Sequence, residues 1–359
     1  MHTQVTKDAF SGQKIFVGLD VHKKDFKVSV MAGAVLYKTF SSPPDGQKVL
    51  SFLQHHFPGA EYYSAYEAGF SGFWLHKQLM ELGVNSIVVN PADIPTTDKE
   101  RRQKEDQRDS RKLARDLVAG QLKAIYVPTE KTIHDRILMR SRHTIVKEIR
   151  RSKQRIKSLL YFQGIRYPDK FAIEGNHWSK NFIKWLESII FENESGKQGL
   201  QIHIETLRHH RQLLLQTNHQ IRALSKSDQY RERVENLISV PGIGMLTAMN
   251  LLTELETITR FENFNHLCSF AGLVPATDSS GDDDVTTGIT PRKNSGLRSA
   301  MIESAWVAIR NDPALMSAYL QYCKRMSSTR AIVRVAKKLL NRVAHIFRKN
   351  EKYQKSIVK

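Results

Sequence analysis

The sequence has very little cysteine and no long apolar run. Its 359 residues include two cysteines, Cys268 and Cys323, and no Cys-x-x-Cys pair, so neither a disulfide framework nor a structural zinc site is predicted. No apolar stretch approaches the roughly 18 residues of a membrane-spanning helix, and the N-terminus lacks the apolar core of a signal peptide. We therefore expect a soluble cytoplasmic protein without a membrane partner.

Acidic residues are scarce relative to basic ones. Lys and Arg number 55 against 36 Asp and Glu, which gives a formal net charge of +19. An excess of this size favours a polyanionic partner, for which nucleic acid is the natural candidate. The length is sufficient for roughly two or three domains, each with its own core.

The first 128 residues predict an arm followed by an α/β domain. Residues 1–13 are polar and without periodicity, which is typical of a loose arm. Short apolar or alternating runs then predict strands, the first three of them as an antiparallel meander, and two helices with one apolar face each separate the later strands. The Val127-Pro128 pair is a plausible end for this domain, which we place at residues 14–128.

Four carboxylates occupy special positions in this domain. Asp20 ends the first predicted strand, Glu67 ends an aromatic-rich strand, and Asp106 and Asp109 stand three residues apart near the start of a helix, where they share one face. Carboxylates at one end of a sheet suit hard cations such as Mg²⁺ or Mn²⁺, and two such ions about 4 Å apart support in-line phosphoryl transfer. The alternative is that the same acids are a cap, a turn former and two surface charges.

The motifs around these acids resemble the DEDD transposase family of bacterial insertion sequences, which includes the Piv and MooV DNA invertases. Asp20 lies in Val-Gly-Leu-Asp-Val-His-Lys at residues 17–23. Residues 104–110 read Lys-Glu-Asp-Gln-Arg-Asp-Ser and resemble the family's Lys-Thr-Asp-x-x-Asp-Ala signature, with Glu105 and Ser110 as departures. The resemblance implies a RuvC-like, ribonuclease-H-type domain in which the four acids are catalytic metal ligands.

The composition changes after residue 128 to long charged and aliphatic segments with little glycine, which predict a helical region over residues 129–230. Between residues 136 and 160, apolar residues at helical intervals are surrounded by Lys and Arg. Arg150 and Arg151 on this basic helix are candidate contacts to nucleic acid.

A second helix in this region carries an apolar residue at every seventh position: Leu200, Leu207, Leu214 and Ile221. This spacing is compatible with a helical hairpin within the chain or with a coiled coil between two chains. The family resemblance favours the coiled coil, and with it a homo-oligomer, either a dimer or a tetramer.

Residues 237–244 read Leu-Ile-Ser-Val-Pro-Gly-Ile-Gly and precede an apolar helical face, so they resemble a helix-hairpin-helix. In such an element, Gly242 and Gly244 would let backbone N–H groups at a helix N-terminus contact a phosphate. The alternative is a Pro-Gly turn between two core helices.

The run Asp-Ser-Ser-Gly at residues 278–281 places serine hydroxyls among small residues. The surrounding block, residues 231–323, resembles the C-terminal transposase domain of the same family, whose Ser-Gly element supplies the nucleophilic serine. The resemblance implies that Ser280 is the nucleophile, with Ser279 as the second candidate.

Asn294 and Arg298 follow the serine and are candidate nucleic-acid contacts. The family usually reads Ile-Thr-Lys-x-Gly-Asn here, whereas this chain has Pro291 and Lys293 in place of the Lys and the Gly. The three aspartates at residues 282–284 predict an exposed acidic loop.

Residues 324–359 hold twelve Lys and Arg and one acid, Glu351, a net charge of +11. Apolar residues recur at helical spacing, so we expect a basic helical tail that docks on the body and turns its charged face to a nucleic-acid backbone. Arg334, Lys337 and Lys338 are the candidate contacts.

Together these features predict a transposase or site-specific recombinase of an insertion sequence that cuts and rejoins DNA through a serine nucleophile and a metal-holding acid cluster. The family resemblance further implies a structured, element-encoded guide RNA that bridges target and donor DNA, and a place at the bacterial nucleoid. Two alternatives stay open: a RuvC-like junction nuclease that uses metal-activated water, and a non-catalytic nucleic-acid-binding protein.

Overall fold

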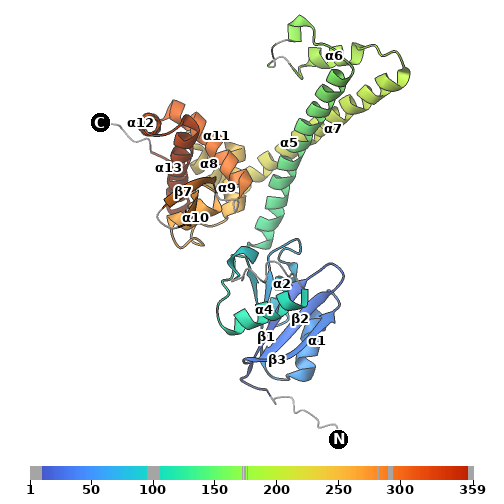
Figure 1. Ribbon diagram of the computed structural model, residues 1–359. Coiled ribbons are helices and arrows are strands. Elements are labelled where there is room, and N and C mark those ends of the chain that lie inside the picture. The colour runs from blue at the N-terminus through green and yellow to red at the C-terminus, as the bar shows by residue number, and fades with distance from the viewer. Residues whose placement is uncertain are drawn as a thin grey trace. The chain divides into compact units, whose positions relative to one another are not determined.

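The computed structural model describes residues 10–94, 106–171, 173, 175, 177–280, 283–289 and 294–354. The chain divides between Val127 and Pro128 into two compact units. Figure 1 shows a mixed sheet with helices in the first unit and a mostly helical second unit, which confirms the predicted order of an α/β part and a helical part. Within the described residues, no helix is both long and apolar enough to cross a membrane. Most of the predicted arm, residues 1–9, lies outside the described residues.

The first unit is built on one five-stranded sheet of order β3-β2-β1-β4-β5. Its strands are β1 (Lys14–Val21), β2 (Phe26–Ala32), β3 (Val35–Ser42), β4 (Glu61–Glu67) and β5 (Asn85–Val89). The first three strands pair antiparallel, which confirms the predicted meander, and β4 and β5 run parallel to β1. The carboxyl ends of β1 and β4 therefore lie at the same edge of the sheet.

Successive side chains of β1 point to opposite faces of the sheet, and each face is covered by different helices. Ile15, Val17 and Leu19 are fully buried in a core shared with two helices, α1 (Gly46–His56) and α2 (Trp74–Glu81). Gly18 points to the opposite face and contacts α4 (Asp106–Val118). The sheet thus separates the apolar core under α1 and α2 from the face that carries α4.

The second unit contains nine α-helices within its described residues and one β-hairpin. The helices are α5 (Glu130–Phe162), α6 (Lys180–Ser188), α7 (Glu194–Ser225), α8 (Arg231–Ile238), α9 (Met245–Leu255), α10 (Phe264–Phe270), α11 (Ser295–Asn311), α12 (Pro313–Cys323) and α13 (Ser328–Lys349). A short 3-10 helix, η1 (Pro91–Asp93), follows β5 in the first unit, and another, η2 (Asp169–Phe171), follows α5. The hairpin is formed by β6 (Pro275–Ser280) and β7 (Asp283–Ile289).

The long helices α5 and α7 pack against each other as an antiparallel pair, side by side in Figure 1. Arg142 donates to Asn218 at 2.7 Å, and Ser152 lies 3.1 Å from His210, so residue numbers rise on one helix as they fall on the other. Three of the four heptad positions are buried: Leu200, Leu207 and Ile221. The structure thus contains the helical hairpin within the chain, and a coiled coil between chains stays a prediction.

The basic C-terminal segment is part of the core rather than a tail applied to it. The apolar stripe of α13 is almost completely buried and belongs to the same cluster as residues of α9 and α11: Ile332, Val335, Leu339, Val343 and Ile346. The exposed side of the helix carries Arg334 and Lys338, and Lys337 is half-buried beside the ring of Phe264. The prediction of an amphipathic basic helix is confirmed, but the helix forms the core itself because its buried stripe runs over its full length.

Candidate active site

The sheet brings Asp20 and Glu67 together at one edge. Leu19 of β1 is the register partner of Tyr66 of β4, and these strands are parallel, so the next residues, Asp20 and Glu67, are neighbours at the carboxyl ends. Their faces agree as well, since Phe16 and Tyr63, which stand four residues earlier on each strand, stack with ring centroids 5.5 Å apart. Both carboxylates therefore project to the face that carries α4.

Helix α4 is seated directly on β1 at Gly18. A Cβ atom at this position would collide with the carbonyl oxygen of Ser110 and the amide nitrogen of Ala114, so only glycine allows the helix to approach this closely. Leu113 and Ala114 are buried on the same side of the helix. The early turns of α4 thus lie over the strand that carries Asp20, two residues after Gly18.

The contact at Gly18 is completed by a buried pair of hydroxyls. Ser110 Oγ lies 2.9 Å from the hydroxyl of Ser29, which is the register partner of Gly18 on β2. Both serines are fully buried. The departure of Ser110 from the Ala of the family signature is therefore matched by a hydrogen-bonding partner on the strand below it.

The packing of α4 on β1 at Gly18 positions the two aspartates of this helix. Asp106 is the first residue of the helix, and its side chain lies outside the described residues. Asp109 is half-buried and immediately precedes Ser110. The structure therefore brings Asp20 and Glu67 side by side and sets the start of α4 over the same face of the sheet.

The carboxyl ends of β1 and β4, with Asp20 and Glu67, form an acid edge of the sheet. His22 lies next to this edge, although the sequence motif did not mark it as a site residue. Its Nε2 lies 3.0 Å from Oδ2 of Asp20, with exposed side-chain fractions of 38% for His22 and 23% for Asp20. The signal was present in the sequence, because residues two apart at a strand end project to the same side. This contact restricts the orientation of the Asp20 carboxylate.

Tyr66 fixes the loop that follows Glu67. Its hydroxyl donates to the carbonyl of Gly72 at 3.0 Å and accepts from the amide of His76 at 3.3 Å. Burial raises the pKa of Tyr66 to about 12, so the phenol keeps the proton that it donates. The strand end that carries Glu67 is thereby held against α2.

The chemistry of these side chains suits a hard divalent cation, since carboxylate oxygens are its preferred ligands. Among the described side chains, no group of three His, Cys, Asp or Glu residues is close enough together to hold a metal ion. The predicted fourth acid, Asp106, is absent from this comparison because its side chain lies outside the described residues.

The helix-hairpin-helix prediction falls on α8 and α9, which are joined by a tight turn at residues 239–244. Gly242 adopts a left-handed φ of +85°, and a Cβ there would meet the carbonyl oxygen of Ser304 on α11, so this glycine is required for packing. Gly244 is the N-cap of α9, has open space around it, and leaves the first amides of the helix without a side-chain cap. A pocket of about 420 Å³ lies at this turn, with Val307 and Asn311 on its other side.

The candidate nucleophile Ser280 is the last residue of β6 and pairs with Asp283, the first residue of β7. Asp283 and Asp284 belong to β7, so the predicted acidic loop is in this part a strand. Gly281 and Asp282 lie outside the described residues, as do the side chains of both strands. Ser280 therefore stands at the end of a hairpin strand.

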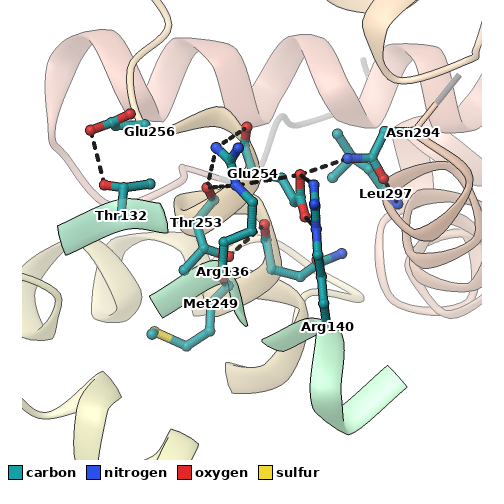
Figure 2. Close-up of polar contacts among 10 residues, drawn as sticks. Thr132, Arg136, Arg140, Met249, Thr253, Glu254, Glu256, Asn294 and Leu297 are labelled. Carbon is teal, nitrogen blue, oxygen red and sulfur yellow. Dashed lines mark hydrogen bonds and ion pairs between the residues drawn. The ribbon is translucent and has the colours of Figure 1, made fainter. Parts of the chain in front are cut away.

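Asn294 uses its side chain within the protein. Its Oδ1 accepts from the amide of Leu297 at 2.9 Å and caps α11, and its Nδ2 donates to the buried Glu254 at 2.8 Å (Figure 2). Arg298 follows one turn later on α11 and is half-buried. The contacts give Asn294 a capping role, which the sequence motif alone did not indicate.

Arg150 and Arg151 are exposed on α5, as predicted for a face that meets nucleic acid. Arg151 forms an ion pair with Glu148, three residues earlier. Such a surface pair is worth at most about 1 kcal/mol, so it does not prevent Arg151 from contacting a phosphate.

Two family models match the chain. Residues 17–163 match a transposase model of the DEDD type of IS110 elements, and residues 234–321 match the model described as "Transposase IS116/IS110/IS902 family". The chain belongs to the DEDD transposase family of insertion sequences. The first match contains the acid edge and α4, and the second contains the α8–α9 turn and the β6–β7 hairpin, so both candidate centres of the transposase lie inside the matched segments.

Similar proteins include further transposases and a DNA-inverting protein. A putative transposase of Sinorhizobium fredii, y4qE, is 29% identical over 88% of this chain and 77% of its own length. The transposase for insertion sequence element IS1533 of Leptospira borgpetersenii is 27% identical over 97% of this chain and 99% of its own. The pilin gene-inverting protein of Moraxella bovis is 25% identical over 47% of this chain and 55% of its own. The transposase is thus an enzyme of DNA recombination.

Proposed function

We propose that this transposase cuts and rejoins DNA with Ser280 as nucleophile, and that Asp20, Glu67, Asp106 and Asp109 hold Mg²⁺ or Mn²⁺. The observation that carries the proposal is the parallel register of β1 and β4, which sets two acids of the family signature side by side under the start of α4. The match of the second model to residues 234–321, which contain Ser280, supports the role of the serine.

The domain assignment follows the same division. Residues 14–128 form the RuvC-like, ribonuclease-H-type domain, supported by a sheet in which three antiparallel strands are followed by two parallel ones. Residues 129–230 form a helical region, and residues 231–323 form the transposase domain. Residues 324–359 form the basic helical tail, and the apolar stripe of its helix α13 packs in one core cluster with α9 and α11.

In the proposed reaction, Ser280 Oγ forms an ester bond to a DNA phosphate while the bond from phosphorus to one deoxyribose oxygen breaks. The serine gives up its proton, and the leaving oxygen takes one. A second deoxyribose hydroxyl then attacks the phosphorus and gives up its proton while the bond from phosphorus to Ser280 Oγ breaks. The serine oxygen takes a proton, and the new phosphodiester bond rejoins the DNA. A bound divalent cation supplies charge neutralisation at the phosphate oxygens. The four acids hold that charge, and His22 fixes the orientation of Asp20.

The remaining contacts are assigned to the phosphate backbone. The uncapped first amides of α9 at Gly244 suit a phosphate, because a helix N-terminus carries partial positive charge. The exposed side chains of Arg150 and Arg151 on α5, and of Arg334 and Lys338 on α13, add sequence-independent attraction. We also propose an element-encoded guide RNA and a homo-oligomer, which the family resemblance implies.

Trapping the reaction on a nicked suicide substrate tests the proposal. The wild-type protein should form a covalent DNA adduct, and mass spectrometry should place the adduct on the peptide that contains Ser280. Ser280→Ala should bind DNA and form no adduct, whereas the neighbouring control Ser279→Ala should retain it. Cleavage without an adduct would instead favour the junction nuclease with activated water.

A further inference from the structure

Glu254 is a buried carboxylate at the point where three helices of the second unit meet (Figure 2). It is 4% exposed and lies in the last turn of α9. Arg140 of α5 donates to both of its oxygens, at 2.9 and 3.0 Å, and Asn294, the cap of α11, donates to one of them at 2.8 Å. The carboxylate therefore ties together α5, α9 and α11.

Local helix physics does not favour a carboxylate at this position. The C-terminal end of a helix carries partial negative charge, and burial of a charge adds a desolvation penalty. Arg136 offsets the first effect, because it donates twice to the carbonyl oxygen of Thr253, at 3.0 and 2.9 Å. Arg136 and Arg140 of α5 thus stabilise the charged Glu254 carboxylate at a helix end that would disfavour it. This arrangement indicates a functional role for the carboxylate.

The role of Glu254 follows from its bond to Asn294, which anchors one end of the segment between α10 and α11. The backbone amide of Asn294 donates to the carbonyl of Phe270 at 3.1 Å, so the two ends of the segment between α10 and α11 are joined. The start of the segment is fixed as well, since Leu273 is buried and its amide donates to the carbonyl of Cys268 at 2.8 Å. The β6–β7 hairpin with Ser280 lies between these two anchors.

We infer that Glu254 is a positioning residue for Ser280: by holding Asn294, it fixes the base from which the β6–β7 hairpin extends. The inference rests on the proposed role of Ser280. Helix α9 then has a function at each end, with the phosphate-contacting amides at Gly244 and the anchor of the hairpin at Glu254. Its 11 residues correspond to about 16 Å, a fixed spacing between the phosphate-contacting amides and the anchor of the hairpin.

Glu254→Gln tests this inference with a change of minimal size. Arg140 and Asn294 share Oε2 of Glu254, and Arg140 also donates to Oε1. The amide is uncharged and has one acceptor oxygen, so its NH₂ group replaces one of the two acceptors of Arg140, and the remaining bonds to Arg140 and Asn294 lose the strength that the charge gives them. Hydrogen exchange should become faster at the amides of Asn294 and Leu297. The single-turnover rate of DNA cleavage should fall by about a hundredfold, the effect of a misplacement of roughly 1 Å, while DNA affinity is unchanged.

Asp312→Asn is the matched control. Asp312 is 1% exposed, caps α12, and accepts from Arg342 at 2.6 Å and from the hydroxyl of Tyr353 at 2.9 Å, so its substitution disrupts an equivalent buried pair in the same unit. This variant should lower the unfolding temperature comparably, without faster exchange at Asn294 or slower cleavage. If the two variants slow cleavage equally, Glu254 acts only through stability and the inference is wrong.

Asn294→Ser isolates the critical bond and applies even if Glu254→Gln fails to fold. Serine is as good a helix cap as asparagine but is too short to reach Glu254. Cleavage by this variant should fall while its unfolding temperature changes little, and wild-type cleavage would overturn the inference. Absence of any adduct on Ser280 of the wild-type protein would instead overturn the proposed function, and the exchange at Asn294 and Leu297 would still report on the anchor.

Discussion

Gly18→Ala should lift α4 off the sheet and thereby disable the acid edge. The added Cβ meets two backbone atoms of α4, the oxygen of Ser110 and the nitrogen of Ala114, so no side-chain rotation relieves the collision. Overpacking of this kind costs about 1–3 kcal/mol, and the gain from replacing a strand glycine offsets about 0.5–1 kcal/mol of it. We expect a net loss of about 1–2 kcal/mol in the free energy of unfolding.

The effect on chemistry should exceed the effect on stability. A displacement of α4 by about 1 Å separates Asp106 and Asp109 from Asp20 and Glu67, which should slow metal-dependent cleavage by about a hundredfold. Urea denaturation and single-turnover cleavage measure the two effects.

Gly69→Ala is the control for this change, because no atom lies within 4 Å of a Cβ at Gly69 and its φ is not in the left-handed region. Wild-type cleavage by Gly18→Ala, or equal losses in the two variants, would refute the proposed seat of α4.

Three further changes test other parts of the molecule. Replacing Arg334 and Lys338 together by Gln should keep the fold and reduce the slope of log affinity against log salt by about 0.9 for each phosphate that is no longer neutralised, and an unchanged slope in fluorescence anisotropy would show that this face does not touch nucleic acid. Ser110→Ala should lower the free energy of unfolding by about 1 kcal/mol in urea, since it removes the bond to Ser29, and unaltered stability would contradict the importance of that bond. Asp109→Asn should abolish cleavage in Mg²⁺ while DNA binding persists, and wild-type cleavage would remove Asp109 from the ligand set.

The elements of the first unit could be predicted because local pattern and tertiary environment agree there. Alternating and continuous apolar runs mark the strands. Glu67 is the last residue of β4, and Asp20 is the last but one of β1. The seat of α4 was not predictable in the same way. It depends on the contact of Gly18 with Ser110 and Ala114 of α4, more than 90 residues later in the chain, and a single sequence carries no signal for such a contact.

In the second unit, the charge and spacing of residues in the sequence predicted less of the structure than in the first unit, because the decisive contacts join distant residues. The apolar stripe of α13 predicted a basic helix that docks on the body, but the sequence did not indicate that this stripe would be buried over its full length. Two heptad residues of α7, Leu200 and Leu207, pack in one cluster with Ile156 and Leu160 of α5 within the chain. The Arg140–Glu254–Asn294 contacts join residues 114 and 40 positions apart, so only the fold reveals them.

The burial of α13 has a consequence for insertion sequences whose transposase genes accumulate inactivating mutations. A stop codon or frameshift before this helix would remove part of the hydrophobic core together with the cationic face, so the shortened product would not persist as a folded competitor for the DNA. Substitutions confined to Ser280 or the acids would leave a folded product that still binds. Inhibition of an active copy by a degraded one is therefore expected from point-mutated genes and not from truncated ones.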